Sequence, residues 1–142
     1  MALGSIGVRT TNLTITQASL EIRTTAAVRA TILEMSIIQV TGTAQWLGLG
    51  RPQAIGVTPG GTSTPIRDEP GSPVCVTTTA LSWGTSPTVP LVFARRWNSA
   101  ATIGVGIIWT FPRGFVIPVS SSAVVWNITT AVACDINVVL DE

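Results

Sequence analysis

The chain contains no histidine, no lysine and no tyrosine, and all eight of its basic residues are arginine. Without histidine there is no Ser-His-Asp or Cys-His couple, and no imidazole to bind a metal or move a proton. Without lysine there is no P-loop lysine and no Schiff base. We also find no pair of carboxylates spaced for acid–base work. The sequence therefore predicts no enzyme and no cofactor, and it points to a structural role.

Charge is also scarce, since charged residues make up 11% of the 142-residue chain, against about 25% in typical soluble domains. The net charge of +1 gives no field that would favour nucleic acid or an anionic membrane. The length suits a single domain over residues 1–142. Because 15 charges cannot cover such a domain, we expect its remaining apolar surface to contact other copies or another protein. The alternative is a monomer whose surface is polar but neutral, built from serine and threonine.

No apolar run approaches the roughly 20 residues that a membrane-spanning helix needs. The first residues lack the basic leader and apolar run of a signal peptide. We therefore expect no membrane association. Cys75 and Cys134 form no CxxC motif and have no histidine beside them, so we expect no metal site. We favour two reduced, buried thiols, although neighbouring strands would allow a disulfide.

Threonine, valine and isoleucine dominate the chain, and these β-branched residues favour strands. Residues 13–24 alternate between apolar and polar positions, with a change of phase near Ala18 and Ser19 that predicts a β-bulge. The second half consists of short strand patterns separated by turn residues. We predict an all-β fold: an antiparallel β-sandwich, jelly roll or barrel type of domain, with the sandwich or jelly roll favoured and about eight to ten short strands.

Residues 28–40 are the most ambiguous part of this pattern. Alternation places Val28, Ala30, Ile32, Ile38 and Val40 on one face of a strand, together with Glu34 and Ser36. A helix over residues 26–38 is the alternative, but the valine and isoleucine content favours the strand. Among such apolar neighbours Glu34 needs a partner. We expect an ion pair with Arg29, Arg51 or Arg95 rather than a catalytic acid.

Residues 48–74 are rich in proline and glycine, which cannot sustain a strand ladder at this density. We predict one long loop here, with a solvated tip at Arg67, Asp68 and Glu69. Loops of this length usually carry function. It would serve as an arm that lies over a neighbouring subunit, or as a binding loop on a rigid scaffold.

Five tryptophans are spread along the predicted strands, about one per strand. They act either as packing anchors, in the core and between subunits, or as a carbohydrate-stacking platform; their scatter favours packing. In a strand, Arg95 and Arg96 point to opposite faces. One would pair with Glu34 or Asp135, and the other would meet solvent or a partner's carboxylate. Our candidate interface residues are Trp46, Arg51, Arg67, Arg95, Arg96, Trp97, Trp109, Phe111, Arg113 and Trp126.

Three segments of the second half resemble small virion proteins of tailed bacteriophages. They are Ala80-Leu-Ser-Trp-Gly-Thr-Ser-Pro-Thr-Val-Pro90, Ala101-Thr-Ile-Gly-Val-Gly-Ile-Ile-Trp-Thr-Phe-Pro-Arg-Gly114 and Ser122-Ala-Val-Val-Trp-Asn127. The resemblance covers mainly residues 80–142, with a weaker match at residues 48–52. Small β-sandwich phage proteins of this size are often head decoration, or cement, proteins, which typically form trimers on the capsid lattice.

The resemblance implies a non-enzymatic virion protein that is made in the host cytoplasm and located on the capsid surface. Its partners would be its own copies, as a homotrimer, and the major capsid protein or another virion protein. Two alternatives stay open: a tail or head–tail connector component, and a receptor- or glycan-binding fibre head that would use residues 48–74 and exposed tryptophans.

Overall fold

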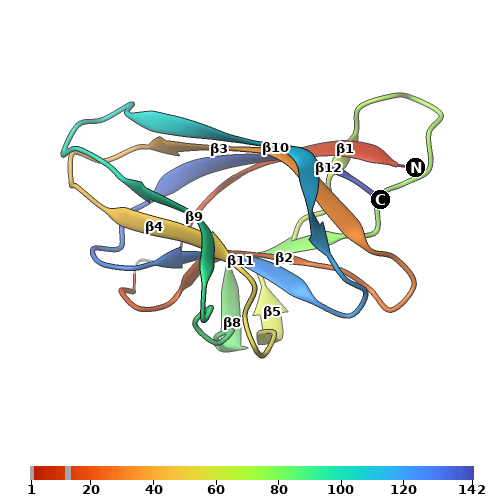
Figure 1. Cartoon of the computed structure of the whole chain (residues 1–142), viewed down its shortest axis with the longest axis horizontal. Coiled ribbons are helices and arrows are strands. Elements are labelled where there is room, and N and C mark those ends of the chain that lie inside the picture. Colours follow the sequence, from red (N-terminus) through yellow and green to blue (C-terminus); the bar gives the residue numbers. More distant parts are fainter. Residues whose placement is uncertain (1, 12–13) are drawn as a thin grey trace.

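The computed structural model of the chain describes residues 2–11 and 14–142. Every regular element in this part is a β-strand (Figure 1). The strands, in chain order, are β1 (Leu3–Arg9), β2 (Ala18–Arg23), β3 (Ala30–Gln39), β4 (Trp46–Gly50), β5 (Val57–Gly60), β6 (Ile66–Arg67), β7 (Thr78–Ala80), β8 (Ser82–Thr85), β9 (Phe93–Asn98), β10 (Gly106–Ile117), β11 (Ser122–Asn127) and β12 (Cys134–Asp141).

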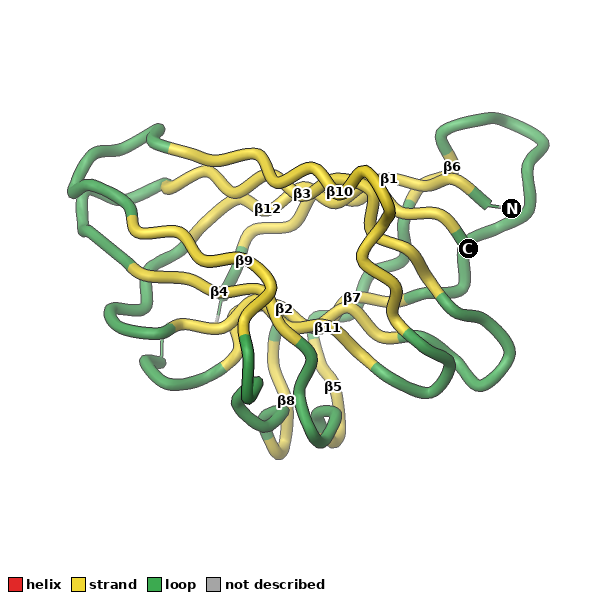
Figure 2. The backbone as a smooth tube through the Cα atoms, in the orientation of Figure 1, coloured by secondary structure: helices red, strands yellow, loops and turns green. Residues whose placement is uncertain are grey.

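The strands form two five-stranded antiparallel sheets that face each other (Figure 2). The first sheet has the order β10-β3-β12-β1-β6, and the second has the order β7-β2-β11-β4-β9. Without the short edge strands β6 and β7, this is the strand order of a jelly roll, in which two four-stranded sheets share an interleaved chain path. The predicted antiparallel sandwich is therefore confirmed. The described residues form more strands than predicted because the connection from β4 to β9 adds four short ones.

The main core lies between the two sheets and is built from the inward side chains of every long strand. A second, smaller cluster lies on the other face of the β2–β11 sheet and contains Ala18, Val124 and Trp126. Trp83 of β8 and Phe93 pack against this second cluster. The two-stranded sheet of β5 and β8 projects from that face of the second sheet (Figure 1). The β2–β11 sheet is therefore buried on both faces, which explains why β11 is buried at every residue.

Residues 30–39 form the predicted strand and not the alternative helix. The predicted face is wrong beyond Ile32, because Leu33 is an extra residue in the pairing with β12, where Glu34 pairs with Val139 and Ile32 pairs with Leu140. The bulge reverses the alternation, so that Met35 and Ile37 are buried and Ile38 is exposed. The bulge predicted near Ala18 and Ser19 is confirmed, since Ser19 is the extra residue in the pairing of β2 with β11. The predicted start of that strand at Leu13 lies outside the described residues.

Residues 48–74 are largely irregular, as predicted, but they begin within β4 and contain two short strands. The strand β5 pairs with β8, and β6 pairs with β1 at the edge of the first sheet. These strands are short, and their partners lie far away in the sequence. The predicted solvated tip is confirmed, since Arg67, Asp68 and Glu69 are all exposed. The loop that follows β6 extends beyond both ends of the chain (Figure 1).

Cys75 and Cys134 are both free and buried, as expected. Cys75 lies next to Gly4 of β1, and Cys134 begins β12, where its Sγ accepts a hydrogen bond from Nε2 of Gln45 at 2.6 Å. Burial is the main cause that raises the pKa of both thiols. Gln45 opposes part of this effect at Cys134. Both residues therefore pack as small, inert side chains.

Candidate functional site

The end strands β9 and β10 of the two sheets lie on the same side of the sandwich, and they bring several predicted interface residues together (Figure 1). We call this surface the β9–β10 edge. Its residues come from the end of β4, the connection into β9, β9 itself and the second half of β10. They are Arg51, Leu91, Val92, Ala94, Arg95, Phe111, Arg113, Phe115 and Val116.

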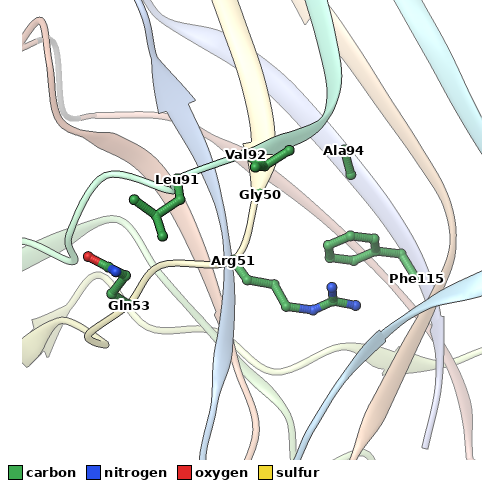
Figure 3. A pocket seen from close by; sticks show the side chains of 7 residues that line it. All are labelled: Gly50, Arg51, Gln53, Leu91, Val92, Ala94 and Phe115. Atoms are coloured by element: carbon green, nitrogen blue, oxygen red, sulfur yellow. The ribbon is translucent and has the colours of Figure 1, made fainter.

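Arg51 crosses the edge from the second sheet to the first. Its Nη2 and Nε donate hydrogen bonds to the carbonyl oxygen of Val116, at 2.6 and 3.2 Å. Its guanidinium carbon lies 4.2 Å from the centre of the Phe115 ring, which is a cation–π distance. Arg51 and Phe115 line a shallow, mainly apolar hollow of about 280 Å³, together with Leu91, Val92 and Ala94 (Figure 3). Arg51 therefore joins the two sheets and presents a charged group beside apolar surface.

Arg95 and Arg113 extend the positive charge along the edge. The guanidinium carbon of Arg95 lies 5.1 Å from the centre of the Phe111 ring. Arg113 follows Pro112 in a bulge of β10, where the pairing with β3 jumps from Thr110 to Phe115. Both arginines line a second hollow of about 340 Å³. Proline and a bulge are common ways to stop an edge strand from pairing with another strand, so contacts at this edge are left to side chains.

The three arginines of the β9–β10 edge form no ion pair with any described residue. The ion pairs found in residues 2–11 and 14–142 are Arg9 with Asp135, at 2.8 Å, and Arg23 with Glu21, at 3.1 Å. Hydrogen bonding from Arg9 lowers the pKa of Asp135. The predicted pairing of Asp135 with Arg95 or Arg96 is therefore wrong.

Glu34 also differs from its prediction. Within the described part of the chain it forms no ion pair with Arg29, Arg51 or Arg95. The bulge at Leu33 accounts for this, because it places Glu34 outside the core, where water solvates the carboxylate.

The remaining predicted interface residues are dispersed. Arg96 stacks on Phe93, and Trp46 is exposed at the start of β4. Arg67 lies in β6, at the opposite edge of the first sheet from β10. Three tryptophans are buried within their own chain and have little surface left for a partner; they are Trp97, Trp109 and Trp126. Phe111 belongs to the β9–β10 edge, where it lies under Arg95, but it is also buried.

Glu21 is the residue of consequence that the sequence reasoning missed. Its side chain is fully buried, and its carboxylate accepts four hydrogen bonds. Oε1 accepts from the backbone nitrogen of Gly56 at 3.0 Å and from Oγ of Ser122 at 2.7 Å. Oε2 accepts from Nε1 of Trp83 at 2.6 Å and from Nη1 of Arg23 at 3.1 Å. Its position between Leu20 and Ile22 was the available signal, since an acid inside so apolar a strand needs partners.

These contacts give Glu21 a structural role. Gly56 and Trp83 belong to the segment between β4 and β9, so the carboxylate fastens the two-stranded β5–β8 sheet to the second sheet. Arg23 adds a hydrogen bond to the carbonyl oxygen of Gly56 at 2.7 Å. With every oxygen occupied by donors from its own chain, Glu21 is arranged to hold the fold together.

No three acidic, cysteine or histidine side chains come together in the described residues in a way that would hold a metal ion. No helix that is long and apolar enough to cross a membrane occurs in the same residues. In comparisons with known proteins, no family model, no curated protein and no solved structure matches the chain.

Proposed function

We propose that the chain is a non-enzymatic structural protein of a tailed-bacteriophage virion, and specifically a capsid decoration protein. In this role it forms homo-oligomers on the outer surface of the head and strengthens the shell by contacts with the major capsid protein. The proposal rests on the resemblance of residues 80–142 to small virion proteins and on the surface of the jelly roll.

The β9–β10 edge is the observation that carries the proposal. Leu91 and Val92 are exposed over 77% and 78% of their surfaces, beside arginines that have no ionic partner among the described residues. Across the described residues seventeen large apolar side chains are exposed, Leu91 and Val92 among them, in a chain that carries only 15 charged residues. Arginine together with apolar residues is typical of protein–protein interfaces. Such a surface favours binding to protein subunits.

The tryptophans speak against the glycan-binding alternative. A stacking platform for sugars needs aromatic faces that are open to solvent. Trp97, Trp109 and Trp126 are buried, and the indole of Trp83 is held by Glu21. Trp46 is the one tryptophan that the structure shows as exposed. The observations therefore favour a role in packing and assembly.

The test is to locate the protein in particles of the phage that encodes it, by mass spectrometry and cryo-electron microscopy. We expect jelly-roll density at repeated positions on the outside of the head. Density confined to the tail or the connector would replace the decoration role with the first alternative. Absence of the protein from purified particles would overturn the virion assignment.

A binding experiment then tests the surface. Particles that lack the protein are mixed with the purified chain, and bound protein is measured by sedimentation. We expect Arg51→Glu/Arg95→Glu to reduce binding by about tenfold or more, since reversed charges at an interface repel the partner. Arg9→Glu is the control, because Arg9 is exposed and lies in β1, which β12 and β3 separate from β10.

A further inference from the structure

The opposite side of the molecule carries charge of the other sign. Asp68 and Glu69 follow β6, and Asp141 and Glu142 end the chain beside it. The carboxylate of Glu142 accepts hydrogen bonds from the backbone nitrogens of Val76 and Thr77, both at 2.8 Å. Asp68, Asp141 and Glu142 all act on the pKa of the buried Cys75, so these acids surround one place. We call residues 66–76 with Asp141 and Glu142 the acidic end.

The acidic end is also apolar and prominent. Ile66 and Val74 are exposed over 78% and 66% of their surfaces, and the loop between them extends away from the sheets (Figure 1). Arg67 donates a hydrogen bond to the carbonyl oxygen of Ser72 at 2.9 Å, which holds the loop closed. The four acids form no ion pair with any described residue. Asp68 accepts a hydrogen bond from Oγ of Ser5 at 2.7 Å. The acidic end therefore carries four carboxylates against one arginine, Arg67, beside exposed aliphatic side chains, whereas the charged residues of the β9–β10 edge are all arginines.

The two surfaces cannot meet within one molecule. The strands β6 and β10 are the two end strands of the first sheet, with β3, β12 and β1 between them. Contact between the surfaces therefore needs a second copy, placed so that its acidic end meets the β9–β10 edge of the first. A contact between two different surfaces of identical chains is heterologous, and repetition of it gives a closed ring or an open filament.

We propose that copies of this chain associate head to tail, with the acidic end of one copy docked on the β9–β10 edge of the next. Asp68 and Glu69 face Arg95 and Arg113, and Ile66 and Val74 cover the hollow beside Leu91 and Val92. This deepens the assembly role proposed above and rests on it for its biological setting. The same β9–β10 edge docked on a capsid protein is the competing outcome of the test.

The test reverses the charge of each surface separately and measures mass in solution by light scattering at about 50 mM salt. The monomer mass is 14.8 kDa. We expect the wild type to associate, and both Arg95→Glu/Arg113→Glu and Asp68→Arg/Glu69→Arg to weaken association by about tenfold or more. An equimolar mixture of the two variants regains association, because each supplies the intact surface that the other lacks. Raising the salt to about 500 mM weakens the wild-type complex, since exposed charges are screened.

Matched controls separate the contact from folding and from bulk charge. Arg9→Glu and Asp135→Arg change charge at a solvent-exposed ion pair outside both surfaces and leave the mass unchanged, and far-ultraviolet circular dichroism shows that every variant folds. A wild type that stays monomeric at low salt and high concentration overturns the proposal, as does a mixture of variants that stays monomeric. If the monomeric chain still binds particles, head-to-tail association fails and the decoration role stands. If the chain associates as described but is absent from particles, head-to-tail association stands and the decoration role fails.

Discussion

Glu21 carries a carboxylate into the buried space between the second sheet and the strands β5 and β8, where donors from three separate parts of the chain meet it. Arg23 lies on its own strand, Ser122 on the neighbouring strand β11, and Gly56 and Trp83 in the long connection between β4 and β9. A buried charge with every oxygen bonded is retained at little net cost, whereas removal of one member leaves the others without partners. The attachment of the two-stranded β5–β8 sheet to the second sheet therefore depends on Glu21.

We expect Glu21→Gln to lower the free energy of unfolding by about 3 kcal/mol, because an amide nitrogen would face donors that now bond an oxygen and would leave Arg23 with no counter-charge. Urea denaturation followed by tryptophan fluorescence measures the change. Glu34→Gln is the control and should change stability by less than about 0.5 kcal/mol, since Glu34 has no ionic partner in the described residues. Equal losses of unfolding free energy in the two variants would contradict this structural role of Glu21.

The sequence indicated that an acid within an apolar strand matters, but it directed attention to Glu34 rather than Glu21. Three of the four residues that bond Glu21 lie 35, 62 and 101 positions further along the chain, at Gly56, Trp83 and Ser122. Periodicity reports only on neighbours along a strand, so it cannot reveal such partners. The bulge at Leu33, in turn, removed Glu34 from the face that alternation had assigned to it.

Among the elements, β10 is the long end strand of the first sheet. Its free edge is the one most exposed to unwanted pairing with a strand of another chain. The strand carries Pro112, and Gly114 adopts a φ of 69°. These two residues interrupt the pairing with β3 and turn Arg113 outward. A positive φ is costly for any residue with a Cβ. A Cβ at Gly114 would also collide with the side chain of Thr31 on β3.

Gly114→Ala should therefore destabilise the protein by about 1–2 kcal/mol and displace Arg113. Thermal unfolding gives the stability. Gly42→Ala serves as the matched control because Gly42 has an ordinary φ and its nearest neighbour to a new Cβ is 4.0 Å away. Unchanged stability in Gly114→Ala would show that the bulge tolerates an ordinary residue.

Strand propensity was sufficient to predict most of β2 and β3 and the all-β second half, including the bulge at Ser19, because β-branched residues and phase changes are local signals. It did not predict the short strands β5 and β6 within residues 48–74. β6 has only two residues, and it is a strand because β1 lies beside it. Proline and glycine in this segment correctly indicated turns, but they could not show that the turns fold back onto the parent sheets.

At the scale of the whole molecule, the missing residue types simplify the response to pH. With no histidine, lysine or tyrosine, the cysteine thiols are the side chains that titrate between about pH 6 and pH 11. The pKa of each is raised by burial in the folded protein. As the pH rises, the thiols therefore ionise at a lower pH in the unfolded chain than in the folded protein. This difference stabilises the unfolded state and lowers the free energy of unfolding.

Stability should accordingly stay level from about pH 6 to pH 8 and decrease above about pH 8.5, where an exposed thiol ionises. Urea denaturation across this range measures the trend. The variant Cys75→Ala/Cys134→Ala is expected to be less stable at neutral pH, because two buried side chains are shortened, but to show a flatter profile above pH 8.5. A decrease of the same steepness in this variant would exclude the thiols as its cause.

The candidate surface was only partly visible in the sequence. The scarcity of charge and the exclusive use of arginine pointed to protein contacts, and Arg51, Arg95 and Arg113 do lie on one edge. Their convergence depends on the jelly-roll connection of β9 and β10, which no local pattern encodes. The tryptophans and Phe111 were included because aromatic residues are frequent at interfaces, but strand alternation placed most of them in the core.

The pairing of β1 with β12 joins residues 3–9 to residues 135–141, and β12 also lies between β1 and β3 in the sheet. The first sheet is therefore split in two until β12 is available. A nascent polypeptide would expose its apolar strands until β12 has left the ribosome, and contacts between such distant residues form slowly. Deletion of residues 135–142 should therefore leave a chain that depends on chaperones.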